Sequence, residues 1–437
     1  MCILNRYMSI SIATIICVSL FLAAPAFAKV VTFEKEYTYQ ASEIDSKVTA
    51  RAIAVEQVKR LVLEELGTYL MAETEVKDFR LTKDKVVMLT AGAVQTEILN
   101  EKWDGERYYL KARIKADPDE VTASVDRLRK DTQKSKELED TKKRADEAFK
   151  QIEKLKKELE AVKSDTNKQK EYAKAVDTLS ATDWFDKGYS YSEAKEYDKA
   201  IEAYTKVIAL NPSTPPGLKG DYLALSYHNR GNAYNYKGQH DMAIEDYDKS
   251  IQIDPDYAPA YGNRGAAYGS KGQWDRAIED HNKAIQLDSN TAYVYNNRGF
   301  AYYNKGQYDR AIEDYDKAIQ LNSNLANAYG NRGAAYAKKE QFDRAIEDYN
   351  KMITLDSNNA IPYGLRGNAY RKKGQYDRAI EDHNKAISLN PQGIYYGNRG
   401  ETYWKAGDRN RAIADWQKAC DMGNEYGCKT LGWAKNR

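Results

Sequence analysis

The chain has 437 residues, of which 30% are charged and 42% hydrophobic, and its mean hydropathy of −0.78 excludes a polytopic membrane protein. Its 67 basic and 65 acidic residues give a net charge of +2, which argues against bulk nucleic-acid binding because that function usually needs a strong basic excess. Tyrosine is unusually frequent, with 35 Tyr against 8 Phe, which indicates that one short pattern has been copied many times.

Residues 1–28 have the pattern of a secretory signal peptide. Arg6 precedes an apolar stretch from Met8 to Leu22, and Ala26-Phe27-Ala28 supplies a cleavage site before Lys29. The alternative is an uncleaved membrane anchor, but the apolar run is short for a membrane span. We therefore expect an exported, periplasmic protein with no membrane span after cleavage.

Residues 29–117 predict a small α+β domain. Their hydrophobic spacing predicts a strand, a helix and two extended segments, in the order Val30–Tyr39, Ser42–Ala72, Val86–Val94 and Ile98–Trp103. Asp104-Gly105 is a hairpin signal, and the residues after it alternate as in a half-buried strand. With the stretch Ala50 to Ala54, this order loosely resembles the amino-terminal domain of flagellar assembly T-type periplasmic proteins. The resemblance implies an envelope assembly module.

Residues 118–180 predict a charged helix or a coiled coil. The stretch 119–179 contains no Gly or Pro and has 16 basic and 15 acidic residues. Apolar residues recur every seven positions, with a second set three positions later, at Leu138, Ala145, Ile152 and Leu159 and at Ala148, Leu155 and Val162. One interpretation is a dimeric or trimeric coiled coil, which would make the protein a homo-oligomer. The other is a lone charged helix that bridges two domains.

Residues 181–426 consist of repeats. The block Tyr261–Tyr268 recurs with small changes, and a second block such as Asp309–Ile319 follows each copy. Successive copies carry a glycine 34 residues apart, or 33 at the last step, at Gly231, Gly265, Gly299, Gly333, Gly367 and Gly400. With an aromatic at Tyr261, Gly at Gly265, Tyr at Tyr268 and Ala at Ala277, the pattern resembles the tetratricopeptide repeat (TPR) family.

This resemblance implies a mainly α fold, in which seven helix hairpins stack into a right-handed α-solenoid. Residues 427–437 would add a carboxy-terminal capping helix. The position before each repeat glycine is usually aliphatic in the family, but here it is arginine, as at Arg264. An aspartate such as Asp280 follows sixteen residues later, so we expect a salt bridge inside each repeat.

A series of asparagines offers a candidate binding site. They precede the repeat arginines at Asn229, Asn263, Asn297, Asn331 and Asn398, and Leu365 interrupts the series. By resemblance to the family, this position faces the concave groove, and the series is similar to the asparagine ladder in the repeats of O-linked N-acetylglucosamine transferase. Amides offer donors and an acceptor, so such a ladder would bind the backbone of an extended peptide. The alternative is that these amides bond local backbone.

The residues give no indication of catalysis. No Cys/His cluster has metal-ligand spacing, and neither a phosphate-binding Gly loop nor a nucleophile motif is present. His281 and His383 replace the aromatic of the second repeat block, which is typical of packing residues. We therefore expect no enzyme, no catalytic residue, no metal and no cofactor.

Cys420 and Cys428 are the two cysteines that remain after signal cleavage. In one straight helix their Cα atoms would be about 12 Å apart, beyond the roughly 7 Å limit for a disulfide. Two glycines and an asparagine lie between them, so a turn would bring them together. The interpretations are a disulfide in an oxidising compartment or two buried thiols.

Together these patterns predict a non-enzymatic protein–protein interaction scaffold in the periplasm. Its concave groove would bind an extended segment of a protein or peptide partner, and nucleic acid is not expected as a partner. The alternative is a structural subunit of a cell-envelope assembly that oligomerises through its amino-terminal domain and coiled coil.

Overall fold

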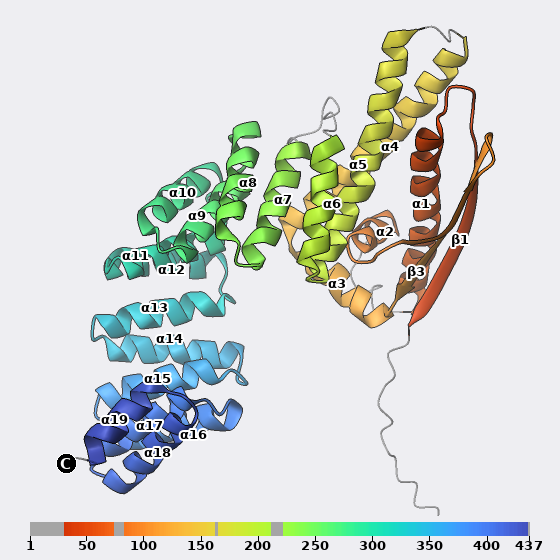
Figure 1. Ribbon diagram of the computed structural model, residues 1–437. Helices are drawn as coiled ribbons and strands as arrows, with labels where there is room; N and C mark the ends of the chain where they lie inside the picture. The colour runs from red at the N-terminus through yellow and green to blue at the C-terminus, as the bar shows by residue number, and fades with distance from the viewer. Residues whose placement is uncertain (1–29, 74–82, 162–164, 211–221, 436–437) are drawn as a thin grey trace, which may run out of the picture.

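The computed structural model describes residues 30–73, 83–161, 165–210 and 222–435 (Figure 1). The predicted signal peptide, residues 1–28, lies outside these ranges. An amino-terminal module combines a small sheet with helices α1 to α4, and an array of helix hairpins leads from α5 to α19 (Figure 1).

The sheet has three antiparallel strands, β1 (Val31–Gln40), β2 (Glu97–Trp103) and β3 (Arg107–Ala116), with β3 in the centre. Val31 lies opposite Ala116 and Gln40 opposite Arg107. The predicted hairpin turn joins β2 to β3: Gly105 has φ 103°, and the Asp104 carboxylate accepts hydrogen bonds from the Glu106 and Arg107 N–H groups at 3.0 and 2.6 Å.

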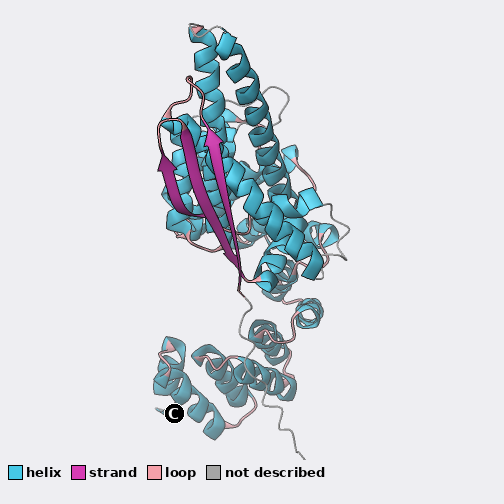
Figure 2. Ribbon diagram, turned by 90° about the vertical axis from the view of Figure 1, so that its right-hand side faces the viewer, coloured by secondary structure: helices cyan, strands magenta, loops and turns pink. Residues whose placement is uncertain are grey.

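Helices cover one face of this sheet, as Figure 2 shows. α1 (Lys47–Glu73) packs on β1 and β3, where Leu110 and Ile114 are buried. α2 (Lys83–Ala91) packs on α1. The expected extended segment Val86–Val94 is therefore wrong over most of its length. Its apolar residues bury against α1 instead of pairing with a strand, and Gly67 of α1 permits the close approach, since a Cβ there would lie 2.7 Å from Val87 Cγ2.

The charged region forms three helices, α3 (Pro118–Lys130), α4 (Thr132–Ala161) and the first half of α5 (Thr166–Glu193). α4 and α5 lie side by side as an antiparallel hairpin (Figure 1). Five residues of the predicted heptad seam pack against Tyr172, Ala175, Val176 and Leu179 of α5, namely Ala145, Ala148, Ile152, Leu155 and Leu159. Leu138 belongs to the core of the amino-terminal module instead, and Val162 lies outside the described residues. The interpretation as a lone helix is therefore corrected, because α4 packs on a helix of the same chain. A homo-oligomer formed through this region stays a prediction.

Seven helix hairpins follow, numbered here as repeats 1 to 7. The second half of α5 pairs with α6 (Tyr197–Leu210) in repeat 1, so α5 belongs to both parts of the molecule. The other pairs are α7 (Tyr222–Tyr236) with α8 (His240–Ile253), α9 (Ala258–Ser270) with α10 (Trp274–Leu287), α11 (Ala292–Asn304) with α12 (Tyr308–Leu321), α13 (Ala326–Lys338) with α14 (Phe342–Leu355), α15 (Ala360–Lys372) with α16 (Tyr376–Leu389), and α17 (Gly393–Lys405) with α18 (Arg409–Asp421). The last helix, α19 (Glu425–Lys435), packs on α17 and α18.

Small residues and ion pairs hold these hairpins together. A Cβ at Gly299 would lie 2.8 Å from Tyr315 Cε1, so glycine lets the two helices of repeat 4 approach closely. The predicted salt bridge is confirmed in repeats 2 to 7. In repeat 4, Arg298 Nε and Nη2 donate to the Asp314 carboxylate at 2.8 and 2.6 Å, and the five other repeats of this group have the same pair. Between repeats, a second series of ion pairs joins a lysine to the preceding repeat, as in Lys305 with Asp275.

Candidate interaction groove

The inner wall of the array consists of the first helices of the repeats. These helices contact one another directly, in the pairs α7–α9, α9–α11, α11–α13 and α15–α17. Within the described part of the chain, the second helices make no comparable contacts with one another. The array therefore curves with its first helices inside.

Four residues on each first helix, spaced by four, three and four positions, share one face of that helix. We call these four places the inner stripe. In order from repeat 1 to repeat 7 it consists of Thr182, Asp186, Tyr189 and Glu193; Leu225, Asn229, Asn232 and Tyr236; Pro259, Asn263, Ala266 and Ser270; Tyr293, Asn297, Phe300 and Asn304; Asn327, Asn331, Ala334 and Lys338; Ile361, Leu365, Asn368 and Lys372; and Ile394, Asn398, Glu401 and Lys405. Every asparagine predicted from the sequence stands at the second place.

The amino-terminal module covers the inner stripe of repeat 1. Lys59 of α1 bonds the Asp186 carboxylate, and Lys134 of α4 bonds Glu193 at 2.6 Å. These contacts place the module in the groove at its amino-terminal end.

Glu137 of α4 extends this contact into repeats 2 and 3. It is only 3% exposed and accepts hydrogen bonds from Tyr189 Oη, from Tyr257 Oη at 2.8 Å and from Asn229 Nδ2 at 3.3 Å. Asn229 itself is only 8% exposed, so its prediction as a peptide-binding residue is corrected: its amide bonds the chain's own Glu137.

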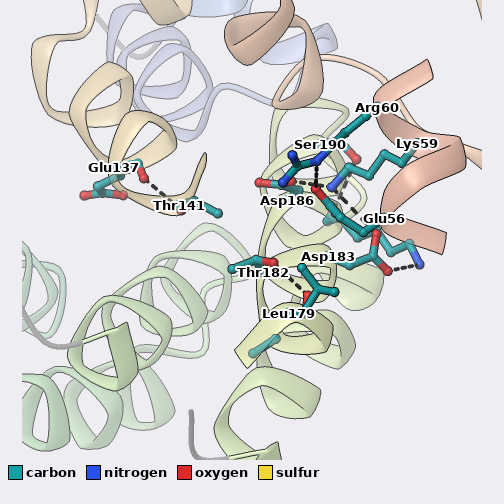
Figure 3. A network of polar contacts seen from close by, with 12 residues as sticks. Glu56, Lys59, Arg60, Glu137, Thr141, Leu179, Thr182, Asp183, Asp186 and Ser190 are labelled. Carbon is teal, nitrogen blue, oxygen red and sulfur yellow. Dashed lines mark hydrogen bonds and ion pairs between the residues drawn. The ribbon is translucent and has the colours of Figure 1, made fainter. Parts of the chain in front are cut away.

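A buried ionic cluster attaches the module to α5 (Figure 3). Lys59 Nζ lies 3.7 Å from Asp183 Oδ1 and also bonds Asp186, while Arg60 bonds Glu56 at 2.8 Å. Burial alone would lower the pKa of Lys59, but the carboxylates of Asp186, Asp183 and Glu56 outweigh it and raise that pKa. Lys59 therefore stays charged. In the sequence, this cluster could have been recognised from Asp186, which is an acid at the second place of the inner stripe, where most later repeats have asparagine.

Three of the other predicted asparagines, Asn263, Asn297 and Asn331, bond asparagine side chains at other positions of the array. Asn263 Nδ2 donates to Asn232 Oδ1 at 2.8 Å. Asn331 Nδ2 donates to Asn296 Oδ1 at 3.1 Å, and Asn296 Nδ2 donates to Asn297 Oδ1 at 3.3 Å. The expected alternative of local backbone bonds is thus replaced by bonds between side chains.

Bonding capacity remains in the later repeats. Within the described residues, the Asn297 N–H groups and the Asn331 carbonyl oxygen have no partner. The Asn398 amide is likewise unbonded in the described ranges.

Exposed apolar side chains accompany these amides. Tyr293, Phe300, Ile361 and Ile394 are 40–55% exposed and occupy first or third places of the inner stripe in repeats 4, 6 and 7. The Phe300 ring lies 6.0 Å from the Trp274 ring in an edge-on arrangement. Sequence reasoning missed these residues. Their signal was a large apolar side chain at places that hold Asn, Pro or Ala in other repeats.

The comparisons with known proteins agree with this architecture. Family profiles of the tetratricopeptide repeat match residues 181–214, 224–257, 246–279, 292–325, 326–359, 360–392 and 394–422, and a TPR repeat profile matches 267–306. The chain belongs to the tetratricopeptide repeat family.

Several solved structures of TPR proteins are similar to this chain. A tetratricopeptide repeat protein from Parabacteroides merdae is 21% identical over 59% of this chain and 99% of its own, with a TM-score of 0.47. MamA is 31% identical over 40% of this chain and 94% of its own, with a TM-score of 0.36. YrrB, described as a TPR protein with an unusual peptide-binding site, is 23% identical over 42% of this chain and 96% of its own, with a TM-score of 0.36. No curated protein matches.

His281 and His383 pack in the interior of the TPR array. His281 and His383 are 1% and 0% exposed, and each lies against the repeat glycine of its own hairpin. Burial, followed by the charge of Arg298, lowers the pKa of His281 to about 4. Burial, followed by the charges of Arg371 and Arg399, lowers the pKa of His383 to about 3. Both imidazoles are therefore neutral near pH 7.

Within the described ranges, no three His, Cys, Asp or Glu side chains are grouped so that they could hold a metal ion. No helix in the same ranges is long and apolar enough to cross a membrane.

A disulfide joins Cys420, in the last turn of α18, to Cys428 of the TPR array's final helix, α19. The chain reverses between them at Gly423, which has φ 78°. Gly427 then permits close contact of the two helices, because a Cβ there would lie 2.6 Å from Ala419 Cβ. Since the two cysteines lie on different helices, the separation expected for one straight helix does not apply.

Proposed function

We propose that this TPR protein is an exported, periplasmic scaffold whose groove in repeats 4 to 7 holds an extended segment of a partner protein. The TPR fold supports a role in protein–protein interaction. The observation that carries the narrower proposal is the location, on one inner wall, of side-chain amides with unused bonding capacity and of exposed apolar side chains. The amino-terminal module contacts this wall in repeats 1 to 3, and burial and then the charge of its Asp131 raise the pKa of Tyr293 in repeat 4. Further along the wall, Phe300, Ile361 and Ile394 are 45–55% exposed.

The two kinds of side chain serve different parts of an extended ligand. The amides of Asn297, Asn331 and Asn398 offer donors and acceptors to a backbone whose own N–H and C=O groups are unpaired. Tyr293, Phe300, Ile361 and Ile394 offer apolar contact to side chains of the ligand, and burying such surface contributes roughly 25 cal/mol per Å². The amides would therefore fix the path of the segment and the apolar side chains would select its sequence.

The proposed location rests on separate observations. The pattern of residues 1–28 is that of a signal peptide, and disulfides such as Cys420–Cys428 persist mainly in oxidising compartments. The loose resemblance of the amino-terminal domain to periplasmic flagellar assembly T-type proteins also supports an envelope location.

Photo-crosslinking from the full chain in its native host tests this function. A photoreactive residue at Ala334, the third inner place of repeat 5, should capture a partner, whereas one at Lys351 on the outer helix α14 should not. Capture at Ala334 should fall several-fold in the Asn297→Ala/Asn331→Ala/Asn398→Ala variant, with the melting temperature nearly unchanged. Equal capture from both positions, or capture that is unaffected by the three alanines, would exclude the groove.

A further inference from the structure

The fourth place of the inner stripe changes its chemistry along the array. In repeats 2, 3 and 4 it holds Tyr236, Ser270 and Asn304, whereas in repeats 5, 6 and 7 it holds Lys338, Lys372 and Lys405. All three lysines are exposed, and none has an acidic partner within the described residues. Three uncompensated ammonium groups thus stand in line along repeats 5 to 7.

Neighbouring lysines show that these three have no evident structural task. Lys339 and Lys373, each the next residue in the chain, pair with Asp309 and Asp343 of the preceding repeat. A lysine in the last helical turn can also stabilise the helix dipole. However, α7, α9 and α11 end without any basic residue in that turn, so the repeat does not need one there.

The other charges on this part of the wall already neutralise one another. Arg371 Nη1 donates to Glu401 Oε1 at 2.5 Å, and Glu401 Oε2 accepts a hydrogen bond from Tyr426 Oη at 3.1 Å. Lys338, Lys372 and Lys405 therefore make the net charge of this part of the wall positive. They lie on the same helix faces as Ile361 and Ile394.

We infer that the partner segment is acidic, with carboxylates along one edge and aliphatic side chains beside them. This inference rests on the proposed function, because it gives the chemistry of the segment in that same groove. Lysine ammonium groups on flexible stems attract carboxylates by charge without demanding one fixed geometry. Such a charged edge speeds association and rejects basic partners. In this arrangement the asparagines bond the backbone of the partner segment, and the lysines select negatively charged side chains on it.

Binding of defined peptides to the mature chain tests this inference. The probes are fluorescein-labelled peptides of about 12 residues, which extend over about 40 Å, with alternating Glu and Val or alternating Gln and Val. We expect the Glu peptide to bind about tenfold more tightly than the Gln peptide at low ionic strength, since each exposed charge pair adds a small increment. The preference should shrink as salt is added.

The chain offers a closely matched control for the lysines. Lys351, Lys385 and Lys418 are exposed on the second helices of the same three repeats and have the same spacing of 34 and 33 residues. Lys338→Gln/Lys372→Gln/Lys405→Gln should abolish the preference for the Glu peptide. Lys351→Gln/Lys385→Gln/Lys418→Gln removes the same charge and should leave the preference intact.

Several outcomes would overturn the acidic partner. They are equal affinity for the two peptides, no binding of either peptide, loss of preference in both triple variants, or tighter binding of an oligothymidylate of similar length. The proposed function is judged separately, by crosslinking at Ala334. Capture there without a preference for Glu would retain the groove and reject only its acidic ligand.

Discussion

His281 and His383, two of the three histidines buried in the described part of the chain, should make the array sensitive to mild acid. His281 and His383 stand where repeats 2, 4 and 5 carry Tyr247, Tyr315 and Tyr349. In the unfolded chain both imidazoles would have a pKa of about 6.5. In the folded chain burial lowers the pKa to about 4 for His281 and to about 3 for His383.

The sign of the effect follows from these two pKa values. As the pH falls below about 6.5, the unfolded chain takes up protons that the folded chain refuses, so the free energy of unfolding decreases. The loss continues until the pH reaches the folded pKa values. At pH 5 it amounts to about 1.5 pKa units for each histidine, or about 2 kcal/mol each at 1.36 kcal/mol per unit. The two together should contribute about 4 kcal/mol.

The His281→Tyr/His383→Tyr variant restores the aromatic of the other repeats and should remove this loss. Urea unfolding followed by circular dichroism at pH 7.5 and pH 5 measures it, and hydrogen exchange assigns it to repeats, because arrays often unfold in parts. Tyr315→His is the converse variant and should create a third acid-sensitive repeat. If wild type and the double variant lose equal stability between the two pH values, the reasoning is wrong.

Three further changes test other parts of the structure. Lys59→Met leaves Asp186 buried without its close counter-charge, while Asp183 keeps Lys187. It should lower the unfolding free energy of the amino-terminal module by about 3 kcal/mol, measured by urea unfolding. Glu340 has φ 60° at the turn where five other repeats have glycine, so Glu340→Gly should raise the unfolding free energy of repeat 5 by about 1 kcal/mol. Replacing Cys420 and Cys428 by alanine removes a short covalent loop and should cost about 2–3 kcal/mol, measured as faster hydrogen exchange in α19.

For each of these three predictions, one result would contradict the reasoning. Unchanged stability of the Lys59→Met protein would mean that Asp186 is hydrated or protonated. Destabilisation by Glu340→Gly would show that the side chain contributes more than its backbone strain costs. Unchanged exchange in α19 of the cysteine-free protein would show that packing alone holds that helix.

Local patterns predicted the repeats, and long-range contacts account for most of what sequence reasoning missed. The pairing of Arg264 with Asp280 recurs at a fixed spacing inside one hairpin, so the sequence was sufficient to predict it. The seam at Ile152 showed that α4 needs a partner helix, but a heptad pattern does not say which chain supplies it.

The asparagines show the same limit. Asn229 and Asn331 have the same place in their repeats, yet Glu137, from a helix 92 residues earlier in the chain, bonds only the first. Nothing in the repeat pattern itself distinguishes them. The contacts of the amino-terminal module, which the repeat pattern does not predict, therefore decide which asparagines remain free to bind a partner.

The position of Glu137 makes the two directions along the groove inequivalent. α4 forms a wall at the amino-terminal end, where Glu137 lies buried among Tyr189, Asn229 and Tyr257. In the proposed function, an extended segment would have to stop at that end or turn out of the groove. A wall at one end would fix the register of a bound segment relative to the repeats. If the proposed function holds, the groove would therefore fix the position of a ligand along its length as well as select its composition.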